Sequence, residues 1–323
     1  TQNLNVIELA DAVKPSIISS EIDFNTGRLI LYGSEFLDNT PSTNLNLARV
    51  FMIDTNSGID GDMSPLSLTG ATVEAGNNNT LALVLTETQR VRCIQASGTP
   101  GGDGTALKLT VLEHAVSDLS NNLNINSSNV FVKEINDTRV PTIDRVILDL
   151  DSGVLSLFCS ETIDITPATR VHINDISLVD SATGSDVVLF SLANSNLLST
   201  SDATSVNITL GPFERVAAIA NSSFLDGTPL KLHANAVLSD IALNYNLNSQ
   251  ILAIEELEDV TPIVTLHADL DYNDGLLAIH FSEPVDITPL ALINLTLIKL
   301  VNRSGDANIV LQNCIKESII DHF

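Results

Sequence analysis

Hydrophobic and polar residues alternate one by one along much of this chain. In RLILYG, Leu29 and Leu31 alternate with Arg28, Ile30 and Tyr32, and ALKLTV repeats the alternation further on. Successive side chains of a β-strand point to opposite faces, so a period of two predicts strands with one face in a core and the other toward water. Gly, Asn, Asp and Ser cluster between these runs, as in tight turns. No stretch keeps a period of 3.6 residues, so helices are expected to be few and short.

The strand pattern recurs in long repeats. Three segments open alike, and they read PSIISSEIDFNTGRLILYGSEFLD from Pro15, PTIDRVILDLDSGVLSLFCSETIDITP from Pro141 and PIVTLHADLDYNDGLLAIHFSEPVDITP from Pro262. Two later segments also match each other: DGTALKLTVLEHAVSDLSNNLN from Asp103 and DGTPLKLHANAVLSDIALNYNLN from Asp226. A period of about 120 residues is that of a whole β-sandwich domain. The sequence therefore predicts an all-β fold of tandem β-sandwich modules, two complete and one partial.

The repeats define the domain boundaries. We name residues 15–140 module 1, residues 141–261 module 2 and residues 262–323 module 3, which holds about half of the repeat. Residues 1–14, TQNLNVIELADAVK, match the close of a module and are expected to form a terminal strand. A proline opens each module, and proline lacks an N–H donor and has a fixed φ. The junctions between modules are therefore expected to be stiff.

Short motifs within the repeats resemble a known family. FSEPVDITPLALINLTLI from Phe281 and CSETIDITP from Cys159 resemble the early strands of bacterial-type immunoglobulin-like modules of S-layer proteins and adhesins. SDLSNNLN and SDIALNYNLN resemble the Asp-Leu-Ala-Gly-Asn turn near the end of such modules, without its glycine. The resemblance implies that the tandem all-β modules, two complete and one partial, are immunoglobulin-like β-sandwiches, and that the protein is extracellular or at the cell surface.

Composition and charge narrow the range of partners. Hydrophobic residues make up 44% of the chain, which is enough for a packed core. The formal net charge of −25 excludes nucleic acid as a partner, because phosphate binding needs clustered Lys and Arg. No apolar run reaches the ~18 residues of a membrane-spanning helix, so no membrane span is predicted.

Acidic loops are the candidate metal sites, with structural calcium as the one cofactor considered. DFNTG, DLDSG and DLDYNDG occupy the same repeat position, and their spaced oxygens before a glycine are typical of calcium loops and of hairpin turns alike. Both interpretations stay open, and so does the choice between a calcium loop and a solvated insertion for DTNSGIDGD. The candidate ligands are Asp269, Asp271 and Asn273 in DLDYNDG, and Asp54, Asn56, Asp60 and Asp62 in DTNSGIDGD.

Asn-x-Ser/Thr sequons are frequent in this chain. N-linked glycans on them would cover sheet faces and edges, although an asparagine-rich sequence also yields some sequons by chance. The candidate acceptors are Asn78, Asn126, Asn136, Asn207, Asn221, Asn294 and Asn302.

Cysteine and histidine residues show no catalytic or metal-binding spacing. Cys93, Cys159 and Cys314 are odd in number, and we expect small buried side chains, with one pairing between chains as the alternative. The six histidines form no i, i+4 pair and have no cysteine at ligand spacing, which indicates solvated surface side chains. His280 alternates out of phase with Ile279 and is expected to face outward. No nucleophile elbow, phosphate loop or dinucleotide fingerprint occurs, so the chain is predicted not to be an enzyme.

These features together predict a structural subunit of an extracellular fibre, surface layer or stalk, which assembles head-to-tail with copies of itself. In this hypothesis Ile7, Leu9 and Val13 of the terminal strand pack against the partial module of another copy. The alternative is an adhesin that binds a glycan or a cell-surface partner, with or without calcium.

Overall fold

The structure of the 323-residue chain is a computed structural model. It describes residues 7–54, 65–180, 186–225, 227–247, 250–285, 293–301, 304 and 308–311. The chain divides into two compact units, Thr1–Glu258 and Asp259–Phe323. Modules 1 and 2 lie in the first unit except for the last few residues of module 2, and module 3 lies in the second.

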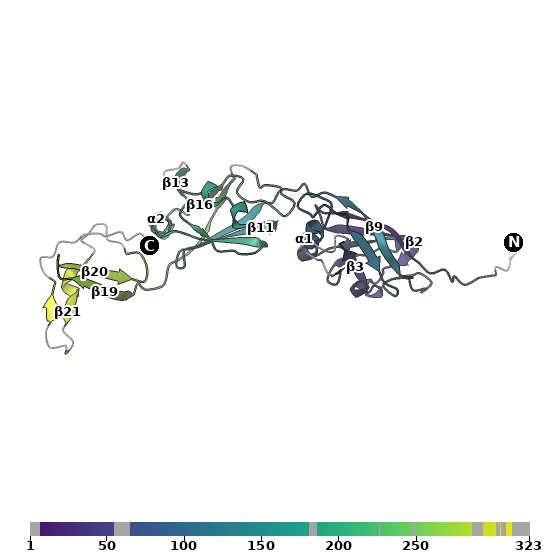
Figure 1. Cartoon of the computed structure of the whole chain (residues 1–323), viewed down its shortest axis with the longest axis horizontal. Coiled ribbons are helices and arrows are strands. Elements are labelled where there is room, and N and C mark those ends of the chain that lie inside the picture. The colour runs from purple at the N-terminus through teal and green to yellow at the C-terminus, as the bar shows by residue number, and fades with distance from the viewer. Residues whose placement is uncertain are drawn as a thin grey trace. The chain divides into compact units, whose positions relative to one another are not determined.

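Module 1 consists of short strands and one α-helix (Figure 1). Its strands are β1 (Ile17–Asp23), β2 (Arg28–Asp38), β3 (Val50–Ile53), β4 (Leu66–Ser67), β5 (Thr72–Glu74), β6 (Asn78–Val84), β7 (Lys108–Val111), β8 (Ser117–Asp118) and β9 (Ser127–Ile135). The helix α1 (Glu87–Gln95) follows β6, and two 3₁₀ turns, Ser42–Asn44 and Leu47–Arg49, precede β3.

Module 2 repeats this order of elements. Its strands are β10 (Ile143–Asp149), β11 (Val154–Ile163), β12 (Ile176–Asp180), β13 (Val187–Ser191), β14 (Asn196–Leu197), β15 (Ala203–Thr209), β16 (Lys231–Ala234), β17 (Gln250–Ala253) and β18 (Glu255–Leu257). The helix α2 (Pro212–Ala220) follows β15, and the 3₁₀ turns Ala168–Arg170 and Ile173–Asp175 precede β12.

The two modules share one sheet topology. Module 2 has one sheet in the order β14-β15-β11-β10-β18 and a second in the order β13-β12-β16-β17. Module 1 has the corresponding orders β5-β6-β2-β1-β9 and β4-β3-β7-β9, joined through the long strand β9, which pairs with β1 on one side and β7 on the other. The predicted all-β, immunoglobulin-like sandwich class is therefore confirmed.

Each module has its own hydrophobic core, built by the alternation seen in the sequence. Leu29 and Leu31 are 0% and 1% exposed in module 1, and Leu155 and Leu157 are fully buried at the same positions of module 2. Tight turns precede β2 and β11, where Gly27 and Gly153 have φ of +67° and +70°, a conformation that glycine adopts without strain. The turns set the register that turns these leucines inward.

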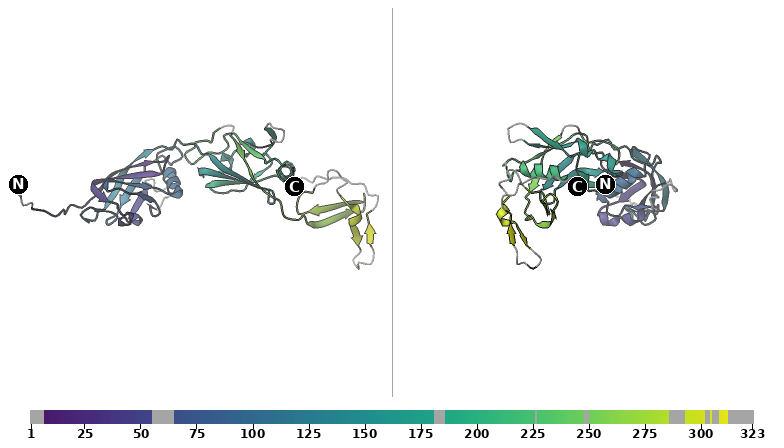
Figure 2. Two further views of the ribbon diagram at one scale, coloured as in Figure 1. Left: turned by 180° about the vertical axis from the view of Figure 1, so that it is seen from behind. Right: turned by 60° about the vertical axis from the view of Figure 1, so that its left-hand side comes forward.

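The second unit contains two small antiparallel sheets, a hairpin of β19 (Thr265–Asp271) and β20 (Leu276–Phe281) and a pair of β21 (Lys299–Val301) and β22 (Asn308–Val310) (Figure 2). A 3₁₀ turn, Leu295–Leu297, precedes β21. The hairpin matches β1–β2, but its inward-facing Leu277 and Ile279 are only half-buried. Among the described residues, no helix is long and apolar enough to cross a bilayer.

Candidate functional site

Arg90 lies where module 1 meets module 2. It belongs to α1, which begins after Thr86 with a capping box: the Thr86 side chain accepts a hydrogen bond from the Gln89 amide, and the Gln89 side chain accepts one from Thr86. This cap fixes the first helical turn and with it the position of Arg90. The Arg90 side chain is only 7% exposed.

The buried guanidinium of Arg90 is bound by acceptors from both modules. Its Nε and Nη2 donate to the two oxygens of Glu87 at 2.7 and 2.8 Å. Its Nη1 donates to Asp137 at 2.6 Å and to the carbonyl of Phe24 at 3.0 Å. Nη2 also donates to Glu161 on β11 at 2.9 Å. A side chain of module 1 is thus held by a carboxylate of module 2.

Further contacts complete this junction. Glu87 also accepts a hydrogen bond of 2.8 Å from the backbone amide of Thr162 in module 2. Asp240 contributes a third buried carboxylate beside Asp137 and Glu161, with ligand-type oxygens within 4.8 Å of one another. We call Arg90 with Glu87, Asp137, Glu161 and Asp240 the junction cluster.

Burial and the local charges shift the pKa values of Glu161 and Arg90 in the junction cluster. Burial raises the pKa of Glu161 to about 7; the positive charge of Arg90 opposes this, whereas the negative charges of Asp137 and Asp240 add to it. One oxygen of Glu161, Oε1, has no hydrogen-bond partner within the described chain. Burial opposes the charged form of Arg90, but the hydrogen bonds and charges of the surrounding carboxylates outweigh it and raise the pKa of Arg90. The guanidinium therefore stays charged.

An apolar contact accompanies the polar one. Ile241 and Ala242, from the loop between β16 and β17, are 4% and 3% exposed because they pack into the core of module 1. Gly101 approaches this loop so closely that an added Cβ would overlap the carbonyl oxygen of Ile241. The expected stiffness of the junction thus has a physical source beyond the proline, namely packing and ion pairing between the modules.

A second group of three carboxylates, like Asp137, Glu161 and Asp240, lies at the start of module 1. Asp11, Glu35 and Asp118 hold the repeat positions of Asp137, Glu161 and Asp240, and their ligand-type oxygens also lie within 4.8 Å of one another. The same local bonds recur in the two sets. The backbone amides of Val13 and Arg139 donate to the side chains of Asp11 and Asp137, each at 3.0 Å. The side chains of Asn122 and Asn244 donate to the backbone carbonyls of the same two aspartates, each at 3.2 Å.

The exposure of this second set differs from that of the first. Leu119 holds the repeat position of Ile241 but is 56% exposed. Glu35 Oε1 has no hydrogen-bond partner within the described chain, and burial together with the charges of Asp11 and Asp118 raises the pKa of Glu35. We call Asp11, Glu35, Asp118 and Leu119 the acceptor face of module 1.

The acidic hairpin turns are built by their own hydrogen bonds. Asp23 Oδ1 accepts from the backbone and side-chain nitrogens of Asn25 at 3.0 and 2.8 Å, and Asp271 Oδ1 accepts from those of Asn273 at 2.7 and 2.8 Å. These contacts are those of a turn, and they give Asp271 and Asn273 a role without calcium. Asp269 lies before the turn, on β19.

The predicted insertion loop is described only at its edge. Asp54 Oδ1 accepts a hydrogen bond of 3.3 Å from Thr105. The other three candidate ligands, Asn56, Asp60 and Asp62, lie outside the described residues.

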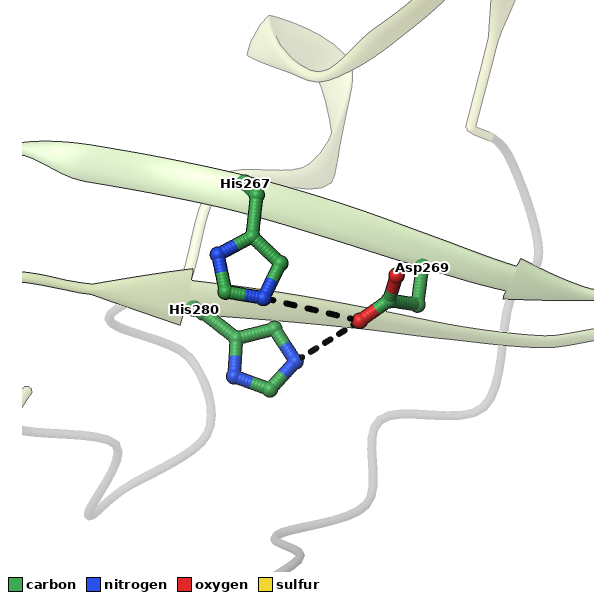
Figure 3. A group of neighbouring side chains, drawn as sticks. All are labelled: His267, Asp269 and His280. Atoms are coloured by element: carbon green, nitrogen blue, oxygen red, sulfur yellow. Dashed lines mark ion pairs between the residues drawn. The ribbon is translucent and has the colours of Figure 1, made fainter.

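Two of the histidines are neighbours in space, which their spacing in the sequence did not indicate. His267 and His280 lie directly opposite each other on β19 and β20, with ring centroids 4.1 Å apart. Asp269 Oδ2 lies 3.7 Å from Nε2 of His267 and 3.1 Å from Nε2 of His280 (Figure 3). An i, i+4 search tests helical neighbours, whereas neighbours on a hairpin are i, i+2 and cross-strand pairs. The predicted hairpin register was therefore the signal that could have found this group.

The described sequon asparagines differ in accessibility. Asn78, Asn126, Asn136 and Asn294 are exposed, whereas Asn207 is half-buried. Asn221 is also half-buried, and its side-chain nitrogen donates to the carbonyl of Ala217 at the end of α2. Asn302 lies outside the described residues. Glycosylation stays a prediction for all seven.

Two of the three cysteines are described, and both are free thiols. Cys93 is fully buried, and Cys159 is partly buried against the core of module 2. Burial raises the pKa of each to about 12, so neither is a reactive thiolate at neutral pH. Cys314 lies outside the described residues.

The apolar side chains of the predicted terminal strand are exposed. Ile7, Leu9 and Val13 are 86%, 89% and 66% exposed, and residues 7–14 belong to no strand. Their role in assembly stays a prediction.

Comparison with known proteins assigns no family. No protein-family model matches the sequence, and no curated protein matches it. Among solved structures, one match is a marsupial T cell receptor, with 13% sequence identity over 71% of this chain and 92% of that chain. Its TM-score is 0.17, so the similarity carries no argument about fold or function.

Proposed function

We propose that this chain is a structural building block of an extracellular fibre, surface layer or stalk, in which immunoglobulin-like modules are locked end to end. The observation that carries the proposal is the junction cluster, where Arg90 of one module is buried among carboxylates that include Glu161 of the next. A chain of modules on free hinges has no use for such a contact. It suits an array whose modules keep a fixed arrangement.

The acceptor face of module 1 extends this argument. It repeats the buried carboxylates Asp137, Glu161 and Asp240 of the junction cluster, and it leaves Leu119 exposed where Ile241 is buried. Charge complementarity therefore favours, as the partner of the acceptor face, a module end that carries an arginine as Arg90 is carried by module 1. Junctions of one type, used repeatedly, produce a linear array.

The exposed residues 7–13 support association between copies. In the hairpin β19–β20, Leu277 and Ile279 are half-buried, whereas the equivalent Leu29 and Leu31 of module 1 are buried. An extended segment that carries Ile7 and Leu9 would cover such an apolar sheet face and pair with its edge. Head-to-tail contact of this kind gives an open filament.

The sequence supports an extracellular setting. Its motifs resemble bacterial-type immunoglobulin-like modules, which belong to surface proteins, and four sequon asparagines are exposed. Glycans on these would shield the sheets. Nothing in this proposal uses a catalytic step, a nucleic acid or a membrane span, and copies of the chain itself are the expected partners.

Negative-stain microscopy and sedimentation velocity of the full chain over a range of concentrations test the proposal. We expect head-to-tail oligomers that grow with concentration. A variant with Ile7→Ser and Leu9→Ser should lose them, because it removes the apolar side chains that cover the partner.

Leu198→Ser is the matched control, since Leu198 is 54% exposed but lies in module 2 and belongs to neither association surface. It should assemble as the unchanged chain does. A chain that stays monomeric at every concentration, while it binds a glycan array, would favour the adhesin alternative. Equal assembly of all three proteins would also contradict the proposed contact.

A further inference from the structure

The outward face of the hairpin β19–β20 brings two imidazoles and one carboxylate together. His267 and Asp269 are two residues apart on β19 and so share a face, and His280 lies opposite His267 on β20. The ligand-type atoms of the three side chains lie within 4.8 Å of one another (Figure 3). We call these three residues the histidine face.

The histidine face is specific to module 3. The repeat positions of His267 and His280 hold Ser19 and Tyr32 in module 1, where these two residues pair in the same register. Arg145 and Phe158 are paired at these positions in module 2.

The third position varies as well, since Asp269 corresponds to Glu21 in module 1 and Ile147 in module 2. The sandwich tolerates three unrelated sets of side chains here. Folding therefore does not require two histidines and an aspartate at these positions.

The donor set selects the chemistry of a ligand. Two neutral imidazole nitrogens and one carboxylate oxygen suit Zn²⁺ and related divalent transition metals, whereas Ca²⁺ prefers oxygen ligands alone. We propose that His267, Asp269 and His280 bind a divalent transition-metal ion, with Zn²⁺ as the expected one. Three protein ligands leave the fourth tetrahedral position to water or to a group from another molecule.

The distances agree with this assignment. Metal–ligand bonds of about 2.0–2.1 Å in tetrahedral geometry place neighbouring ligand atoms about 3.3–3.4 Å apart. The two nitrogen–oxygen distances, 3.1 and 3.7 Å, lie on either side of that value.

Side-chain rotations must bring the nitrogen lone pairs to one point. The rings are nearly parallel, at 9°, and must turn toward each other. The side chains of His267 and Asp269 are 59% and 70% exposed, so they are able to turn. Ala278, opposite Asp269, is too small to obstruct this.

Calorimetric titration of the full chain with ZnCl₂, in excess CaCl₂ to occupy oxygen-only sites, tests the proposal. We expect one Zn²⁺ equivalent to bind and the imidazole proton resonances of His267 and His280 to shift. A variant with His267→Ser and His280→Tyr carries the side chains of module 1 at these positions, so it should fold normally by circular dichroism. Its Zn²⁺ affinity should fall at least about tenfold, since it loses two ligands.

His114→Asn is the matched control. His114 is exposed, lies in module 1 and has φ of +64°, which asparagine tolerates. This variant should bind Zn²⁺ as the unchanged chain does. Equal Zn²⁺ affinity in the double variant, or no Zn²⁺ binding to the unchanged chain in excess CaCl₂, would overturn the proposal.

Discussion

Arg90 of module 1 and Glu161 of module 2 form a buried ion pair of 2.9 Å. Their side chains are 7% and 8% exposed, and Asp137 shares the same guanidinium at 2.6 Å. Taking charges out of water is costly, so the pair adds little net stability by itself. Removing one partner is costly, however, because the remaining charges stay buried without compensation. We therefore expect the junction to favour correct pairing of the modules over any other arrangement.

Replacing Arg90 tests the energetic role of the junction. Arg90→Leu should lower the free energy of unfolding by about 3–5 kcal/mol, because buried carboxylates lose their counter-ion. Urea denaturation followed by circular dichroism measures the change. Arg28→Leu is the control, since its pair with Glu74 is 42% and 41% exposed and such pairs contribute about 0–1 kcal/mol. Equal losses in the two variants would contradict a special role for Arg90.

Gly101 tests the close approach between the modules. Its φ is +84°, and a Cβ at this position would overlap the backbone of Ile241, so Gly101→Ala carries both backbone strain and a clash. Gly104 has φ of +90°, and no atom of the described chain lies within 4 Å of a Cβ placed there. Gly104→Ala should cost about 1–2 kcal/mol from strain alone. Gly101→Ala should cost clearly more in thermal denaturation, and equal costs would argue against the contact.

Much of the fold follows from local patterns in the sequence. Alternation in RLILYG and VLSLFC predicts which side chains enter the core, and Leu31 and Leu157 are buried accordingly. Proline and turn residues mark the repeat boundaries. The helices α1 and α2 have nine residues each and are short, as predicted. Their positions in the sequence were not predicted. The helix α1 begins after the capping residue Thr86, and α2 begins at the Gly211-Pro212 step. A search for long helical periods detects neither signal.

The junction cluster was not predicted, because its residues are far apart in the sequence. Glu161 and Asp240 recur in module 1 as Glu35 and Asp118. Their meeting with Arg90 depends on how one module ends against the next, which hydrophobic periodicity does not encode. A comparison of acidic positions between repeats would have identified the carboxylates but not their partner.

The acidic turns are expected to be structural without calcium. Asp23→Ala removes an acceptor for both nitrogens of Asn25, so it should lower the free energy of unfolding by about 1 kcal/mol. The loss should be the same with CaCl₂ and with a chelator, because the bonds lie within the turn. Glu113→Ala, at an exposed loop position, is the control and should have little effect. A chelator effect present in the unchanged chain but absent in Asp23→Ala would instead establish a calcium loop.

Glu161 should make stability depend on pH in a defined direction. Burial raises its pKa from an ordinary 4.5 to about 7 in the folded protein, so the folded state binds this proton more tightly than the unfolded state does. Its contribution to stability is complete below pH 4.5 and is lost as the pH rises through about 7. Glu161→Gln keeps the shape of the side chain and has no proton to lose.

The informative quantity is the difference in unfolding free energy between the unchanged chain and Glu161→Gln. Carboxylates outside the junction cluster titrate alike in both proteins, so their effects cancel in the difference. We expect the unchanged chain to lose stability relative to the variant between about pH 4.5 and 7, and the difference to level off above that range. Urea midpoints at intervals of half a pH unit would measure it. If the unfolding free energy changes with pH in the same way in both proteins, Glu161 stays ionised throughout and Arg90 compensates its charge fully.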